Sequence, residues 1–268
     1  MLYVICHPSE NRGPLLNGAQ RLVEFYTEKG YHPRSSKHGD VLCDFLLDDL
    51  MRECPAFRQA AVKGTICYQQ NPKGKSNTPL AWKLDLAIGP TLRTPDLANV
   101  KVPIRAPPDD LWIAVDAKSI MTEHGKARRN RQRDLNSLAA IIHMKNPRTV
   151  VGGLVVINVA PSFRSPTRKG EITIHKNIDR LVAESVRLFE DLPRAPARGL
   201  EGGNLNEIDA IGVIVVDYTN IKDTPARLVT EPPAPQPGSP LHYDCFVRTI
   251  CEAFTARFIT LPRDGDLQ

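Results

Sequence analysis

Two kinds of apolar spacing divide the chain into predicted helices and strands. Apolar side chains that recur every three to four residues indicate amphipathic helices, and strict alternation or a short apolar run indicates strands. Pro55 falls inside one helical pattern and is expected to interrupt it. The predicted helices are residues 15–31, 40–62, 123–144, 178–192 and 243–258, and the predicted strands are residues 82–88, 111–118, 149–159 and 208–217.

The order of these elements predicts an α/β fold. Two consecutive strands joined by a loop favour an antiparallel hairpin, whereas strands joined through helices favour parallel crossovers. We therefore expect a mixed β-sheet flanked by helices within a single domain that spans residues 1–268. It would have an N-terminal helical segment (about 1–64), a core (about 65–218) and a C-terminal helical extension (about 219–268). Polar residues 69–79 are expected to form a loop, and proline-rich residues 225–240 an exposed linker or flap.

Composition is that of an ordinary globular protein, with 41% hydrophobic and 24% charged residues among 268. No apolar run approaches the roughly 20 residues that span a bilayer, so we expect no membrane association. Residues 1–8 are apolar but lack a basic leader, which argues against a signal peptide and for a cytoplasmic protein. The cysteines are scattered without a CxxC pair and are expected to be reduced thiols: Cys6, Cys43, Cys54, Cys67, Cys245 and Cys251.

Positive charge is concentrated in one segment. The net charge is +5, and between Lys118 and Arg133 there are six basic residues against one acid, Glu123. A charged run is usually a solvated helix face, but the scarcity of compensating acids here favours contact with the phosphates of DNA. The candidate DNA-binding residues at the start of this helix are Lys126, Arg128, Arg129, Asn130, Arg131 and Gln132.

The strand at residues 111–118 ends in side chains that carry chemistry. Side chains alternate between faces, so Asp116 and Lys118 share one face at the strand's exit. If the preceding strand pairs with it as a hairpin, Asp85 projects beside Asp116. Two adjacent carboxylates repel each other, and Mg²⁺ relieves this repulsion because it binds one or two carboxylates together with waters and phosphate oxygens. Lys118 would then orient or deprotonate a water molecule and offset charge in a transition state.

Asp85, a spacer and then Asp116-Ala117-Lys118 resemble the PD-(D/E)xK motif, the signature of most type II restriction endonucleases and of related repair nucleases. The likeness covers about residues 40–158, with Leu84 where many members have proline. It implies that Asp85 and Asp116 are metal ligands and Lys118 the catalytic lysine. An acidic residue on the helix before the hairpin often joins the site in this family, and Glu53 is the first candidate, with Asp49 as the alternative.

The predicted function is a Mg²⁺-dependent endonuclease that hydrolyses phosphodiester bonds in double-stranded DNA, of the type II restriction endonuclease kind. A symmetric recognition sequence would favour a homodimer. The alternatives are a DNA repair or modification-dependent nuclease and a non-catalytic DNA-binding module. Two segments with little periodicity, 91–110 and 161–176, are also expected to contact DNA through basic side chains: Arg93, Lys101, Arg105, Arg164, Arg168 and Lys169.

Overall fold

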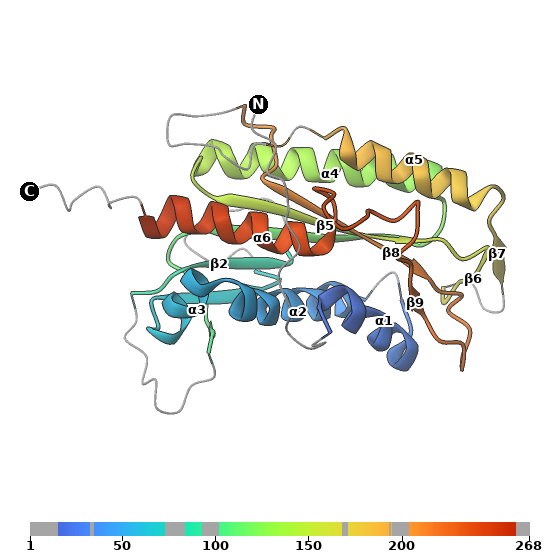
Figure 1. The fold of residues 1–268 in the computed structure, drawn as a ribbon, viewed down its shortest axis with the longest axis horizontal. Coiled ribbons are helices and arrows are strands. Elements are labelled where there is room, and N and C mark those ends of the chain that lie inside the picture. Colours follow the sequence, from blue (N-terminus) through green and yellow to red (C-terminus); the bar gives the residue numbers. More distant parts are fainter. Residues whose placement is uncertain are drawn as a thin grey trace, which may run out of the picture.

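The centre of the molecule is a mixed β-sheet with helices on both faces (Figure 1). The computed structural model describes residues 16–32, 35–72, 84–92, 102–167, 171–192, 194 and 204–260. Within them the main sheet has seven strands in the order β3-β1-β2-β4-β5-β8-β9, and β6 and β7 form a separate two-stranded sheet. The predicted α/β class is therefore confirmed.

Strand directions follow the expected division between hairpin and crossovers. β2 pairs with β4 in antiparallel register, and β4, β5 and β8, which are joined through α4 and α5, are parallel. β1 is antiparallel to β2, and β9 closes the far edge antiparallel to β8. The strands are β1 (Ile66–Gln70), β2 (Leu86–Pro90), β3 (Ile104–Arg105), β4 (Ile113–Ile120), β5 (Val150–Asn158), β6 (Ser162–Arg164), β7 (Ile172–Ile174), β8 (Ala210–Asp217) and β9 (Arg227–Leu228).

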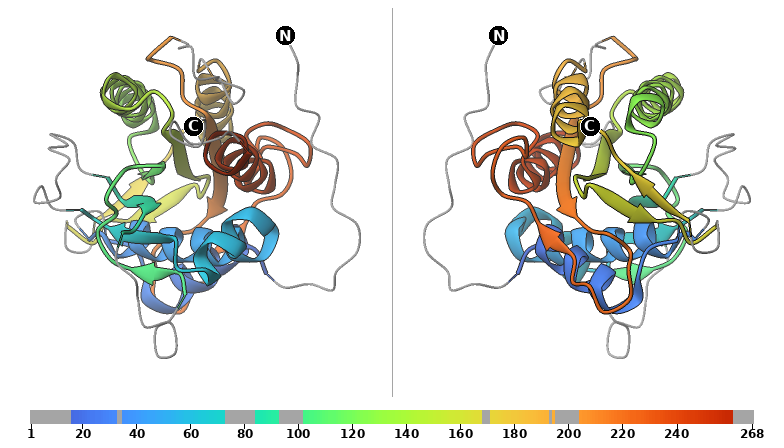
Figure 2. Two further views of the ribbon diagram at one scale, coloured as in Figure 1. Left: turned by 90° about the vertical axis from the view of Figure 1, so that its left-hand side faces the viewer. Right: turned by 90° about the vertical axis from the view of Figure 1, so that its right-hand side faces the viewer.

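The helices divide the core between the two faces of the sheet. α1, α2, α3 and α6 pack on the face of Ile113 and Val115, and α4 and α5 cover the face of Ala114 and Val151. Figure 2, which looks along the length of the fold, shows α4 and α5 on the opposite side of the sheet from α1–α3. The helices are α1 (Gly18–Lys29), α2 (Lys37–Glu53), α3 (Pro55–Val62), α4 (His124–Lys145), α5 (Ile178–Glu190), α6 (Tyr243–Phe254) and the π-helical turn Thr255–Thr260.

Two glycines in β5 let helices approach both faces of the sheet closely. A Cβ on Gly153 would lie 2.9 Å from Leu135 of α4, and one on Gly152 would lie 3.0 Å from Ile250 of α6. At these distances a larger residue would force the Leu135 or Ile250 side chain to shift, so the glycines allow close packing of both helices. α4 is therefore seated directly above β4 and β5, next to the polar end of β4.

Three sequence-based boundaries were wrong. The predicted loop 69–79 overlaps β1, whose outer positions are polar because β1 lies near a sheet edge. Residues 225–240 are not simply an exposed linker, because β9 pairs with β8 and Ala226 and Ala234 are buried. β2 begins at Leu86, which leaves Asp85 just before the strand instead of inside it. Pro55 does interrupt the second helix, where it forms the first turn of α3.

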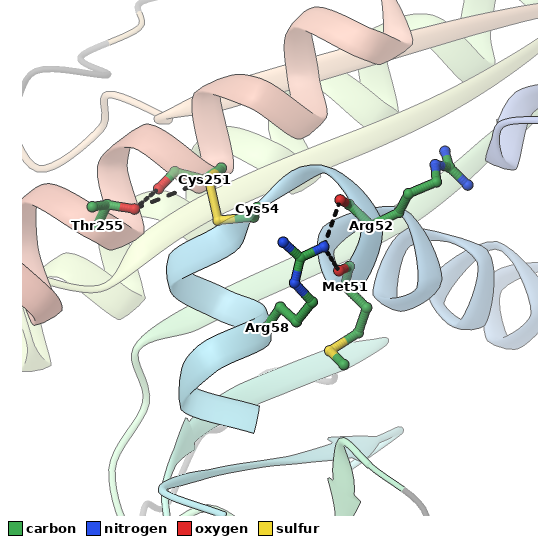
Figure 3. Close-up of a disulfide and its surroundings, with 6 residues drawn as sticks. All are labelled: Met51, Arg52, Cys54, Arg58, Cys251 and Thr255. Carbon is green, nitrogen blue, oxygen red and sulfur yellow. Dashed lines mark hydrogen bonds between the residues drawn. A yellow bond between two sulfur atoms is a disulfide. The ribbon is translucent and has the colours of Figure 1, made fainter. Parts of the chain in front are cut away.

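A disulfide joins Cys54, at the α2–α3 junction, to Cys251 of α6 (Figure 3). Cys245 is also disulfide-bonded, whereas Cys43 and Cys67 are buried and form no disulfide. Cys6 lies outside the described residues. The expectation that all cysteines are reduced was therefore wrong, because the helices bring together residues 197 positions apart. No helix within the described ranges is both long enough and apolar enough to cross a bilayer.

Candidate active site

The candidate site lies where β2 and β4 separate. Their last paired residues are Leu86 and Val115, and β4 continues for five more residues beside β5. Asp85 stands at this fork. Its backbone N–H donates to the carbonyl of Val115 over 3.3 Å, and its carboxylate Oδ2 accepts the backbone N–H of Ala117 at 2.8 Å. The carboxylate thus satisfies a strand donor that β2 no longer reaches.

Asp116 is the most buried charged group of the site, with no exposed surface. Its Oδ1 accepts a hydrogen bond from Lys118 Nζ at 2.6 Å, and the Lys118 side chain is 20% exposed. The other oxygen, Oδ2, is buried and has no hydrogen-bond partner among the described residues. A buried carboxylate oxygen without a partner is costly, so the site presents an unfilled position for a hydrogen-bond donor or a cation.

The electrostatics of Asp116 follow from this geometry. Burial raises the pKa of its carboxyl from 3.8 to about 7. The charge of Lys118 opposes this rise, while the Asp85 carboxylate adds to it by its charge and by accepting a hydrogen bond from the protonated form. The Asp85 carboxylate is therefore close enough to disfavour ionisation of Asp116, as in other paired-carboxylate sites.

The first turn of α2 packs over the fork. A Cβ on Gly39 would lie 3.8 Å from Cγ of Asp85 and 3.9 Å from Cβ of Ala117. Next to Gly39 are His38 and Asp40. Burial lowers the pKa of His38 against the raising effect of the Asp85 and Asp40 charges, so its imidazole is held close to these acids.

Asp40 is held in place at this end of α2. Its Oδ2 accepts the hydroxyl of Ser36 at 2.9 Å, and its Oδ1 accepts the side-chain amide of Asn71. Gln70 Nε2 donates to the Asp40 carbonyl at 2.8 Å, which fastens the helix start to β1. The sequence analysis did not single out Asp40, which lies in the first turn of α2 beside the fork. The neighbouring Gly39, unusual inside a helix, was the available sign that the backbone approaches another element closely there.

The acids chosen from the sequence lie towards the other end of α2. Glu53 is exposed and pairs with Arg52 Nε at 2.7 Å, and fourteen residues of helix, about 21 Å, separate it from Gly39. Asp49 is buried, where it accepts the hydroxyl of Tyr243 and the backbone N–H of Gly18, each at 2.7 Å. Neither residue joins Asp85 and Asp116. The structure thus places Glu53 far from the fork, because the helix runs away from it.

The basic start of α4 divides into two groups. Lys126, Arg129 and Asn130 are exposed, as a DNA-contacting surface requires. Arg128, by contrast, is only 15% exposed and donates to Glu184 of α5 at 2.6 Å. Arg128, a candidate DNA-binding residue, therefore ties α4 to α5 in this structure.

Arg131 and Gln132 are half-buried, and Arg131 pairs with Asp134 at 3.0 Å. Of the further basic residues, Arg105 and Arg164 are exposed, while Arg93, Lys101, Arg168 and Lys169 lie outside the described residues.

Comparison of the chain with protein-family models, with curated proteins and with solved structures finds no match.

Proposed function

We propose that the protein is a Mg²⁺-dependent endonuclease that hydrolyses phosphodiester bonds in double-stranded DNA, of the PD-(D/E)xK type. The proposal rests on the arrangement of side chains at the fork, where β2 and β4 separate. Asp85 and Asp116 stand side by side there, Lys118 is bonded to one oxygen of Asp116, and the other oxygen has no partner among the described residues. An ordinary surface ion pair would leave neither a buried unpaired oxygen nor a second carboxylate beside it.

The donor set fits magnesium. Among the described residues no cluster of three or more His, Cys, Asp or Glu side chains could hold a metal, which argues against a protein-only cage such as a structural zinc site. Mg²⁺ needs only one or two carboxylates, and its remaining positions take waters and phosphate oxygens. Asp85 and Asp116 would hold the ion. When bound, it would supply charge neutralisation and polarisation of the scissile phosphate.

The side chains of the chain itself have separable roles. The Asp85 carboxylate is fixed by the Ala117 N–H, so its free oxygen is oriented before any ligand arrives. Lys118 keeps its ammonium beside Asp116 at 2.6 Å, where it can orient water and offset the negative charge that develops on the phosphate. Asp40, at the start of α2, would complete the acidic surroundings in the place first given to Glu53.

The order of elements supports the same family. α2, the antiparallel pair β2 and β4, α4 and β5 occur in the order of helix, strand pair, helix and further strand that the motif's resemblance implies, with α3, β1 and β3 inserted among them. α4 leaves the end of β4 with Lys126 and Arg129 exposed, so phosphates of a duplex at the fork would meet positive charge. A type II restriction endonuclease with a symmetric recognition sequence would act as a homodimer, which the molar mass in solution with and without DNA would test.

The decisive experiment is cleavage of plasmid and genomic DNA by wild type, Asp116→Asn and Lys118→Ala in Mg²⁺ and in EDTA. Wild type should cleave only with Mg²⁺. Both variants should lose cleavage, and Lys118→Ala should keep metal-dependent DNA binding because it removes no ligand. Asp217→Asn is the matched control, since Asp217 also ends a parallel strand and pairs with a basic side chain, Arg227 at 2.5 Å, outside the site. Cleavage in EDTA, or by Lys118→Ala, would overturn the proposal, and DNA binding without any cleavage would favour the non-catalytic module.

A further inference from the structure

A pocket of about 400 Å³ opens beside the fork, at the carboxyl end of β4. It lies between Tyr31, which follows α1, the first turns of α4, and the β6–β7 hairpin. Ser119, the residue after Lys118, lines it, and the Tyr31 ring is centred 5.0 Å from the ring of His38. At strand rise, Ser119 is three residues or about 10 Å along β4 from Asp116. The pocket therefore opens at the end of the same strand that carries Asp116 and Lys118.

Two aromatic rings form an ordered apolar wall of the pocket. The rings of Tyr31 and Phe163 are 6.1 Å apart at 71°, and both side chains are buried. The Tyr31 hydroxyl is hydrogen-bonded to Ser119 at 2.7 Å, which fixes its ring. Rigid aromatic faces of this kind suit a flat conjugated ligand and give binding energy without a large entropy cost.

The polar lining carries both signs of charge. Arg131 uses Nη1 for Asp134, but its Nε is buried without a hydrogen-bond partner among the described residues. Carboxylates come from Glu123 and Glu171. Glu123 also adopts a left-handed conformation, with φ 50° and ψ 41°, which side-chain-bearing residues rarely adopt and which is frequent at binding sites.

This lining suits a base better than a simple ion. The Glu123 carboxylate disfavours a bare phosphate, and the Arg131 guanidinium disfavours a bare cation. A nucleobase offers acceptors and donors on one flat ring. Guanine has O6 and N7 for an arginine and an amino group for a carboxylate. The volume also falls within the roughly 300–1,000 Å³ typical of small-molecule sites.

We propose that this pocket binds an unpaired nucleobase, guanine best, of the DNA strand that carries the scissile phosphate. The inference rests on the proposed nuclease function for its substrate, but the binding itself needs no cleavage. The base comes either from a single-stranded segment or from a duplex by extrusion, which costs unstacking energy. In either case the pocket makes the protein sense a base beside the cutting site.

Thr173 of β7 provides a variant that fills the pocket. It lines the cavity from the hairpin, whereas its neighbour Ile174 does not line it and is 75% exposed. Thr173→Trp should block the pocket, and Ile174→Trp is a control of the same size on the same strand. Arg131→Gln keeps the length of the side chain but removes the guanidinium.

The first measurement is titration of dGMP, dAMP, dCMP, dTMP and inorganic phosphate in EDTA. Wild type should bind dGMP best, and Thr173→Trp should weaken it by about tenfold or more, the factor expected from losing base–aromatic stacking. Ile174→Trp should bind as wild type does, and Arg131→Gln should reduce the preference for dGMP over dAMP. Nucleotides that bind no better than phosphate, or unchanged dGMP binding by Thr173→Trp, would overturn the pocket assignment.

The second measurement identifies the source of the base and separates the two proposals. If Thr173→Trp weakens binding of a single-stranded oligonucleotide only, the base comes from single strands. If it weakens the matching duplex as well, the base is extruded. Oligonucleotide binding that is unaffected in both forms would overturn the inference. Because these readouts use EDTA, a protein that binds dGMP in the pocket but never cleaves DNA would refute the nuclease and keep the base site.

Discussion

The backbone N–H of Ala117 donates a hydrogen bond of 2.8 Å to the carboxylate of Asp85, at the point where β2 stops pairing with β4. One carboxylate oxygen therefore continues the strand ladder, while the carboxyl group as a whole stays beside Asp116. The Asp85 side chain therefore has a structural role, as acceptor for Ala117, and an electrostatic role, beside Asp116. Two substitutions of Asp85 can separate these roles.

Asp85→Asn should keep the hydrogen bond to Ala117, because an amide oxygen also accepts, and should remove the charge. We expect it to lose Mg²⁺-dependent cleavage with little loss of stability. Asp85→Ala removes both and should destabilise the fold by about 1–3 kcal/mol, the cost of an unsatisfied buried partner. Chemical denaturation of the two variants beside a cleavage assay makes the comparison. Equal stability of the two would mean that the Ala117 contact contributes nothing.

Asp116 predicts a pH-dependent stability in metal-free buffer. Its folded pKa of about 7 lies above the unfolded value of 3.8, so between these values the folded state keeps a proton that the unfolded state has lost. The contribution is fully present below about pH 4 and is lost as pH rises through about 7, in total on the order of 4 kcal/mol for a rise from 3.8 to about 7.

Asp116→Asn has no such proton to lose. In EDTA it should be at least as stable as wild type at pH 8, and its stability should change less between pH 5 and pH 8. Mg²⁺ at pH 8 should stabilise wild type but not the variant. The measurement is urea denaturation at both pH values with EDTA or Mg²⁺. A wild-type protein that becomes more stable relative to Asp116→Asn on going from pH 5 to pH 8 in EDTA would contradict the raised pKa.

Asp40 and Glu53, which stand at opposite ends of α2, give a test of which acid serves the site. Asp40→Asn should reduce cleavage by about 10–100-fold, the range found when residues around a metal site are replaced. Glu53→Gln should cleave as wild type does, because Glu53 is exposed and pairs only with Arg52 among its described contacts. Cleavage rates at saturating Mg²⁺ decide the matter. A large defect in Glu53→Gln with a normal Asp40→Asn would restore the original choice.

The disulfide between Cys54 and Cys251 should be visible in stability. It closes a loop of 197 residues, and bridges of this kind typically stabilise by about 2–4 kcal/mol. Dithiothreitol should lower the melting temperature of wild type. Cys54→Ser/Cys251→Ser should already have the lower melting temperature without dithiothreitol. The double variant also controls for reduction of other disulfides. If dithiothreitol lowers its melting temperature further, that decrease comes from a disulfide other than Cys54–Cys251. Mass spectrometry after alkylation, with and without reduction, tests the bond directly.

The parts of the fold that depend on local spacing could be predicted from the sequence. Ile113, Val115 and their neighbours alternate clearly, and the antiparallel hairpin and the parallel crossovers follow from element order. The polar strand β1 could not be predicted from its own side chains, because they do not alternate between apolar and polar. It is held in the sheet by backbone pairing with β2, which begins sixteen residues further along the chain. Asp116 and Lys118 are close in sequence, so one strand suffices to place them together.

The rest of the candidate site depends on the direction in which each helix packs against the sheet. The spacing of apolar residues along the sequence does not encode that direction. Whether α2 presents Asp40 or Glu53 to the fork is decided by the way the helix runs across the sheet, and both ends carry acids. Arg128 and Arg129 are adjacent and chemically identical in sequence, yet only Arg128 faces α5 and finds Glu184. The cysteine pairing likewise exists only once α2, α3 and α6 are packed together.

The last prediction uses this difference between neighbouring arginines on α4. Lys126→Ala/Arg129→Ala removes two exposed charges that pair with no acid among the described salt bridges. Stability should change little, because exposed charges contribute little to folding. If both side chains contact phosphates, affinity should fall for all DNA sequences alike and the slope of log K against log salt should shrink by about two.

Arg128→Ala should show the opposite behaviour. It breaks the 2.6 Å contact with Glu184 and should lower the melting temperature, while the salt slope of DNA binding stays at the wild-type value. Glu184→Gln should reproduce the stability loss in direction, because it weakens the same contact from the other side. Fluorescence anisotropy at several salt concentrations, together with thermal denaturation, measures both quantities. An unchanged salt slope in Lys126→Ala/Arg129→Ala would place the DNA on another face of the protein, and a reduced slope in Arg128→Ala would mean that this arginine exchanges Glu184 for a phosphate when DNA binds.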